Sequence, residues 1–395
     1  MSALDGLTVL DLNRRYPGAL ATMFLADFGA RVIKIDPPGS TFAIPDIDTG
    51  SAEFAAHFAL DRNKESIELN LKSDEGREAF YRLCKKADVL VEGYRPGVMQ
   101  RLKADYATLQ EINPRLVYCS VTGYGQDGPY SQLPGHDQNY CAIAGALSLI
   151  GPKNGPPYFA SNMLADAGGA GMHAAVGILI ALMGRERTGE GQFVDVSYLD
   201  GVISLMAYDA SYYLFNGKVP MRGETINTGG AAWANNYRCR DGEYFTLACL
   251  EPHFWENLCR AVGREDLIPF QNPTPEQRDE ISGILSHMFL EKTRDEWFEF
   301  FKGFDVCAAP VYHLDETFRD PQVVHRRMVM EVDDPKLGLV RQLGFPIKFS
   351  ATPGAIRRLG VPVGTDTECV LGEIGYDRDA IERVSGREAS AEEGH

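Results

Sequence analysis

The chain has 395 residues, a formal net charge of −16 at pH 7, 44% hydrophobic residues and 24% charged residues. This globular composition with its acidic excess argues against a nucleic acid or an anionic membrane surface as the main partner. Because the length exceeds that of one ordinary compact core, two domains are expected.

The first 120 residues alternate short apolar strands with helices. Helices are predicted over residues 19–30 and 73–86, and strands at Leu7–Leu12, Arg31–Ile35, Ser66–Leu71, Ala87–Val91 and Leu116–Thr122. Such alternation is typical of the parallel sheet of an α/β domain, whose ligands lie at the carboxyl ends of the strands. No GxGxxG follows the first strand, which argues against a nicotinamide or flavin site.

Ionisable side chains stand at the predicted starts of two apolar helices in the middle of the chain. His136 and Asp137 follow Pro134-Gly135, and Asp166 precedes Gly168 and Gly169. A histidine exchanges protons near neutral pH, first-turn amides can bind an oxyanion, and a carboxylate can act as base or nucleophile. The glycines would let a ligand approach the backbone. Either Asp could instead be a simple helix cap.

Two predicted loops carry cations that suit a phosphate. Arg95 stands on a Pro-bounded loop after a buried strand, and Arg62 and Lys64 occupy a second polar loop. Arginine binds phosphate through paired N–H groups, although a surface salt bridge is the alternative for Arg95.

The remaining features concern compartment and domain organisation. The eight scattered cysteines form no CxxC pair and the N-terminus lacks a basic n-region, so reduced thiols in the cytoplasm are expected rather than disulfides, a zinc site or a signal peptide. The apolar run 174–183 predicts a buried helix too short to span a bilayer. After a loop-rich connector, Asp241-Gly242 predicts a hairpin turn in a second α/β unit, and Glu251 follows an apolar strand.

Seven sequence blocks stand in the order found in family III CoA-transferases and the related alpha-methylacyl-CoA racemases, which the chain resembles from about residue 4 to residue 377. They are FLADFGARVIKID, DRNKESIELNLKSDEGR, DVLVEGYRPGVMQRL, GYGQDGPY, GHDQNY, ERTGEGQFVDVSYLDG and DGEYFTLACLEPHFW. The resemblance implies an acyl-CoA thioester as substrate, no metal or redox cofactor, and an interlocked homodimer with each active site between the large domain of one subunit and the small domain of the other.

The domains expected from this resemblance are a Rossmann-like large domain at 1–215, a linker and small α/β domain at 216–325, and a return segment at 326–395 that completes the large domain and ends in a disordered tail. The catalytic candidates are Asp166, His136, Glu251 and Asp137. The candidates for contacts with the substrate and its CoA are Arg95, Tyr94, Arg62, Lys64, Gly135, Asn139, Gly168, Gly169, Gly229 and Gly230.

The resemblance leaves two reactions open, and both use Asp166. His136, Asp137 and Glu251 match the racemase pattern, in which Asp166 and His136 would exchange the α-proton on opposite faces of a 2-methyl-branched acyl-CoA. The stretch DPQVVHRRMVMEV looks more like the transferases, in which Asp166 would form an acyl anhydride and then a CoA thioester while CoA moves to a carboxylic acid acceptor. We expect the racemase reaction, with the transferase as the alternative and an inactive acyl-CoA-binding partner subunit as a third hypothesis.

Overall fold

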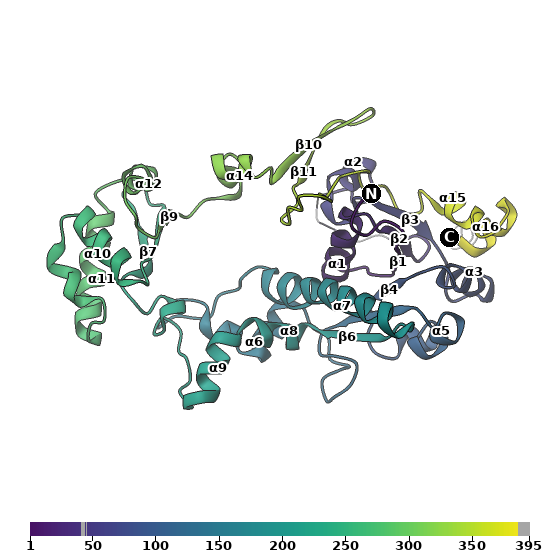
Figure 1. The fold of residues 1–395 in the computed structure, drawn as a ribbon, viewed down its shortest axis with the longest axis horizontal. Helices are drawn as coiled ribbons and strands as arrows, with labels where there is room; N and C mark the ends of the chain where they lie inside the picture. The colour runs from purple at the N-terminus through teal and green to yellow at the C-terminus, as the bar shows by residue number, and fades with distance from the viewer. Residues whose placement is uncertain (41–43, 45, 386–395) are drawn as a thin grey trace. The chain divides into compact units, whose positions relative to one another are not determined.

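The computed structural model describes residues 1–40, 44 and 46–385. It divides into two compact units, each described by itself and traceable by colour in Figure 1. The large unit comprises Met1–Ala144, Ser161–Leu205 and the chain from Pro321 onward, and the small unit comprises Gly145–Ala160 and Met206–Asp320. The tail predicted to be disordered lies, beyond Ser385, outside the described residues.

A six-stranded parallel sheet forms the centre of the large unit, with the strand order β3-β2-β1-β4-β5-β6. Its strands are β1 (Thr8–Asp11), β2 (Arg31–Asp36), β3 (Lys64–Glu68), β4 (Val89–Glu92), β5 (Val117–Thr122) and β6 (Phe193–Ser197). The predicted α/β class with a Rossmann-like parallel sheet is confirmed, because this is the order of a doubly wound sheet. The order reverses between β1 and β4, where ligands of such sheets bind.

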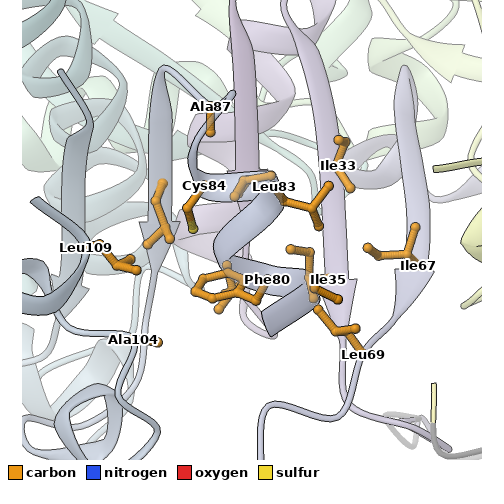
Figure 2. Packing of buried hydrophobic residues seen from close by; sticks show 14 of the residues in the cluster. Ile33, Ile35, Ile67, Leu69, Phe80, Leu83, Cys84, Ala87, Ala104 and Leu109 are labelled. Carbon is orange, nitrogen blue, oxygen red and sulfur yellow. The ribbon is translucent and has the colours of Figure 1, made fainter. Parts of the chain in front are cut away.

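Helices cover both faces of this sheet, because alternate strand residues point to opposite sides. On one face, Phe80 and Leu83 of α3 (Asp74–Cys84) pack with Ile33, Ile35 and Ile67 of the strands, as Figure 2 shows. This core also takes in α5 (Tyr106–Ile112), α15 (Thr367–Gly372) and α16 (Arg378–Ser385). Each fully buried side chain of this size contributes about 1.5–3 kcal/mol.

The second face is covered by α1 (Tyr16–Asp27) and α7 (His173–Thr188). Pro17 suits the first turn of α1, where its missing N–H leaves no bond unmade. Small side chains of both helices, such as Ala21, Ala26 and Ala174, pack against the valines of the central strands. The two helices can therefore lie close to the sheet.

One continuous helical segment runs from Met163 to Thr188, with the π-helix η3 (Met163–Met172) leading into α7. At 26 residues it is long and apolar enough to cross a membrane by length and composition, unlike the shorter run predicted from the sequence. Half of its most apolar window is buried inside the protein, and no second such helix occurs in the described residues. It is not buried all round, since Ile180 and Met183 are 64% and 67% exposed.

The small unit has its own sheet and core. Strands β7 (Ala234–Arg238), β8 (Tyr244–Ala248) and β9 (Ala308–Pro310) form an antiparallel sheet, and the predicted turn at Asp241-Gly242 joins the first two. Gly242 has a φ of +91°, which favours glycine. The core collects Trp255, Phe289 and Trp297 from α10 (Pro252–Ala261), α11 (Pro275–Phe289) and α12 (Arg294–Phe301).

The other elements are shorter and connect these layers. In the large unit they are α2 (Ala52–His57), η1 (Ala59–Asp61), α4 (Val98–Arg101), α6 (Asp137–Ala144), α8 (Tyr198–Leu205), α14 (Pro321–His325) and the hairpin of β10 (Val329–Asp334) and β11 (Gly338–Leu343). In the small unit they are η2 (Ala146–Leu149), α9 (Ala207–Asn216), η4 (Ile226–Thr228), η5 (Glu265–Phe270) and α13 (Leu314–Thr317).

Candidate active site

Asp137 joins the two segments that carry the predicted chemistry. It begins α6, as expected, and its carboxylate is buried. Its Oδ2 accepts hydrogen bonds from the backbone N–H groups of Ala165 (2.8 Å) and Asp166 (3.0 Å), and the Cys141 thiol lies 3.4 Å from Oδ1. The turn containing His136 is thereby held against the backbone that carries Asp166.

Asp166 lies inside the π-helix η3 rather than at its start. The N-cap position belongs to Asn162, so the alternative that Asp166 is a helix cap is wrong. Its carboxylate has no hydrogen-bond partner within residues 1–40, 44 and 46–385. Burial, followed by the charge of Asp137, raises the pKa of Asp166 to about 6. A carboxyl with a pKa this close to neutral can both take and return a proton.

The glycines near Asp166 serve helix packing. A Cβ on Gly169 would lie 3.1 Å from the Tyr198 carbonyl oxygen and 3.1 Å from the Val202 nitrogen, both in α8. A Cβ on Gly168 would lie 2.9 Å from Leu205, and one on Gly201 would overlap the Gly169 carbonyl. This differs from the expectation that Gly168 and Gly169 open the backbone to a ligand, because α8 occupies that side.

His136 presents an exposed side chain on a turn that other residues hold in place. The backbone N–H of His136 donates to Oδ1 of Asn139 at 3.0 Å, so Asn139 fixes the turn. Gly135 leaves room for the ring of Tyr140, which a Cβ there would approach to 2.7 Å. The histidine is therefore free for a ligand while its backbone is fixed.

The charge of Asp166 helps to raise the pKa of three tyrosines, Tyr16, Tyr140 and Tyr198. The sequence alone did not identify them as site residues. Burial is the main cause of the raised pKa of Tyr16 and Tyr198, and Asp166 is the second. Burial, then Tyr124 and then Asp166 raise the pKa of Tyr140 to about 12. The signal for Tyr140 was present in the GHDQNY block, but a tyrosine in an apolar helix is usually a core residue.

The loop after β4 is anchored by a buried carboxyl. Oε2 of Glu92 accepts the backbone N–H of Tyr94 at 2.7 Å, and the Ser120 hydroxyl donates to Oε1. Burial raises the pKa of Glu92 to about 7. Arg95 next to it is exposed and has no ion pair within the described part of the chain, so its guanidinium can take a phosphate.

Arg62 and Lys64 were expected on an exposed loop that binds phosphate, but both lie in the interior of the large unit. Both are buried: Arg62 pairs with Asp27 (2.6 Å), and Lys64 pairs with Asp11 (2.9 Å) while donating to the Thr22 hydroxyl. Buried ion pairs of this kind leave neither charge for a phosphate. Their place is structural, and Arg95 is the predicted phosphate ligand that remains exposed.

The other predicted site residues belong to the small unit. Glu251 is exposed at the N-cap position of α10 and makes no side-chain cap bond. Gly229 has a φ of +84°, and the Gly230 amide donates to the Thr225 carbonyl at 2.8 Å. Arg278 donates to the Gly230 carbonyl, so this glycine pair is held within its own unit.

Comparisons with known proteins identify the family and support the fold. The model of the family described as CoA-transferase family III matches residues 4–367. The human alpha-methylacyl-CoA racemase is 35% identical over 97% of this chain and 96% of its own, and the human succinyl-CoA:glutarate CoA-transferase is 31% identical over 96% and 87%. The crystal structure of a CAIB/BAIF family protein from Brucella suis superposes with a TM-score of 0.81 at 29% identity, covering 94% of this chain and 99% of that one.

Proposed function

The chain belongs to CoA-transferase family III, and we propose that it exchanges the α-proton of a 2-methyl-branched acyl-CoA, so that the configuration at C2 inverts. The observation that carries the proposal is the pKa of Asp166, raised to about 6, on a backbone that Asp137 ties to the His136 turn. The 35% identity to the human alpha-methylacyl-CoA racemase supports the same reaction.

Inversion requires two groups on opposite faces of the α-carbon, because one base alone tends to return the proton to the face it came from. In the proposal, Asp166 removes the proton to give an enolate and becomes neutral. The His136 imidazolium then donates a proton to the other face, and the reverse reaction uses the same groups in swapped roles. The Asp137 and Gln138 amides of α6 stabilise the enolate oxygen, because the Asn139 amide already donates to the His136 carbonyl. Glu251, which belongs to the small domain, is a further catalytic group in the proposal. The reaction needs no cofactor beyond the CoA of the substrate.

Incubation of the enzyme with a single epimer of a 2-methylacyl-CoA in heavy water tests the reaction. Wild type should introduce one α-deuterium and lose optical purity, and Asp166→Ala and His136→Ala should each lower the rate by 10² or more, in the range typical of a general acid or base. Absence of both deuterium and epimerisation in the wild type would rule out the proposal.

The second candidate is CoA transfer between carboxylic acids. It is favoured by the unpaired carboxylate of Asp166 and by a relative named as a CoA-transferase. In this reaction Asp166 attacks the thioester carbonyl and CoA leaves as a thiolate. The thiolate attacks the aspartyl carbonyl of the resulting anhydride, which releases the donor carboxylate and leaves CoA on Asp166 as a thioester. The acceptor carboxylate then expels the thiolate from this thioester, and the thiolate attacks the acceptor's carbonyl in the second anhydride, which forms the new acyl-CoA and frees Asp166. Hydroxylamine would then trap Asp166 in acyl-CoA-treated enzyme, and mass spectrometry would find Asp166 modified. The racemase proposal expects it unmodified.

We also propose a homodimer in the cytoplasm as the working form. Met172, the last residue of η3, and Val176, Ile180 and Met183 of α7 carry exposed apolar side chains. Helix α9 has no buried residue among those described. Apolar surface of this extent is typical of an interface. Six of the eight cysteines are buried, which suits a reducing compartment.

A further inference from the structure

The ring of Tyr140 is fixed more firmly than its place in a short helix requires. It is 6% exposed and packs at 4.8 Å (centroid to centroid) from the Tyr198 ring and 5.0 Å from the Tyr124 ring. Two glycines make room for it: a Cβ on Gly123 would lie 2.5 Å from the ring, and one on Gly135 would lie 2.7 Å from it. The direction of the phenol is therefore set by the backbone at two glycines and by two aromatic rings.

The Tyr140 hydroxyl lies at the turn that holds His136. A Cβ on Gly135, the residue before His136, would be 3.0 Å from this oxygen, and one on Gly123 would be 2.6 Å from it. Within the described residues the hydroxyl has no hydrogen-bond partner, and it is not among the buried polar atoms left unpaired. A phenol that is fixed in direction and has an open donor is suited to a ligand.

Two charged side chains, Asp166 and Arg95, act on this phenol, and in the proposed reaction they contact different ends of the bound thioester. Burial raises the pKa of Tyr140 most, Tyr124 and then Asp166 raise it further, and Arg95 lowers it. In the proposed reaction the α-carbon lies at Asp166 and a phosphate of CoA lies at Arg95. The thioester carbonyl stands between the α-carbon and the CoA chain. The Tyr140 hydroxyl, at the turn that holds His136, is therefore within reach of both charges and is a candidate donor to that carbonyl.

We propose that the Tyr140 hydroxyl donates a hydrogen bond to the thioester carbonyl oxygen and holds the enolate oxygen formed there. The inference rests on the proposed function and adds to it a side-chain donor beside the amides of α6. No proton is transferred from Tyr140, so it stabilises charge and exchanges nothing. Either reaction of the family would use this bond, because an enolate and a tetrahedral adduct both place negative charge on that oxygen.

Tyr140→Phe removes the hydroxyl and keeps the ring, with Tyr124→Phe as the matched control. Tyr124 packs in the same cluster, but the charge of Asp166 does not act on it. The probe is a cinnamoyl-CoA with a para-dimethylamino group, which has no hydrogen on a saturated α-carbon and is not turned over. Hydrogen bonding to its carbonyl shifts its absorbance to longer wavelength, which ring packing alone does not do.

Wild type and Tyr124→Phe should bind the probe with the same red shift, and Tyr140→Phe should bind it with a clearly smaller one. In the exchange reaction Tyr140→Phe should lower kcat by about 10², with KM changed less than threefold. A full red shift in Tyr140→Phe would overturn the inference and leave the proposed function standing. Failure of the wild type to bind any acyl-CoA would overturn the proposed function itself.

Discussion

At the scale of single residues, the carboxylate of Asp137 has two effects on Asp166. It accepts the Asp166 backbone N–H, which fixes the position of the residue, and its charge helps to raise the pKa of the Asp166 carboxyl to about 6. A base with a pKa of 3.8 would be too weak to take an α-proton efficiently near neutral pH. The strength of the proposed base thus depends on a neighbour that need not touch the substrate.

Asp137→Asn should separate these two effects. The amide oxygen still accepts both backbone N–H groups, but the negative charge is gone, so the pKa of Asp166 should fall part of the way from about 6 toward 3.8 because burial remains. Asp166 must be ionised to act as the base, so activity is lost as the pH falls through its pKa. The acid limb of kcat/KM should therefore move to lower pH in the variant.

The matched control for that pH profile is Asp105→Asn. Asp105 caps α5 by accepting the Thr108 N–H and is not among the charges that shift the pKa of Asp166. Its variant should keep the wild-type acid limb. An unmoved or raised acid limb in Asp137→Asn would mean that Asp137 does not set the strength of this base.

At the scale of elements, the π-helix η3 and helix α8 can pack closely because glycines stand where they touch. Gly169 and Gly201 face each other so closely that a Cβ on Gly201 would overlap the Gly169 carbonyl. The π-helix carries Asp166 and α8 begins with Tyr198, so this contact sets how base and tyrosine meet. π-Helical turns are rare and are often found at functional sites.

Gly201→Ala should push α8 away from η3. Overpacking of this kind costs about 1–3 kcal/mol, so the melting temperature and the exchange rate should both fall. Gly283→Ala is the control: Gly283 lies in α11 with open space around its Cβ position, and the variant should gain up to about 1 kcal/mol. Equal melting temperatures for Gly201→Ala and wild type would show that the two helices separate without cost.

The sequence predicted these elements unevenly, for physical reasons. Strands such as β4 and β5 are short and mostly apolar, and local pattern alone identifies them. The ion pair of Lys64 with Asp11 joins residues 53 positions apart, and local sequence does not report such a partner. The sequence therefore predicts an exposed polar loop for Arg62 and Lys64. The π-helical setting of Asp166 depends on glycines of a later helix, and no local pattern reports that. Asp137 at the start of α6 was predictable because its first-turn position is a local property.

At the scale of the whole molecule, the proposed dimer explains an apolar stripe that the single chain leaves open. Met172, Val176, Ile180 and Met183 recur at the spacing of one helix face, while the opposite face of α7 lies on the sheet. A helix with apolar residues on both sides is expected to be covered on both.

Ile180→Lys should weaken the dimer, because a charge would have to be buried at its interface. Light scattering of the wild type should give twice the 43.6 kDa of one chain, and the variant should approach a single chain upon dilution. Leu290→Lys, at an exposed leucine after α11, should leave the mass unchanged. A wild type that stays at 43.6 kDa at all concentrations would exclude the dimer.

The return of the chain to the large unit also affects how the protein is made. Val370, Leu371, Ile381 and Val384 belong to the core on one face of the parallel sheet, and the Val384 carbonyl accepts the Asn70 N–H at 3.0 Å. These residues leave the ribosome after the whole of the small unit. Throughout the synthesis of the small unit, the apolar edge beside Ile67 therefore remains uncovered in the nascent chain. The small unit has nearly all of its sequence in one stretch, so it can finish folding first. The interrupted large unit is therefore the part expected to need chaperones during synthesis.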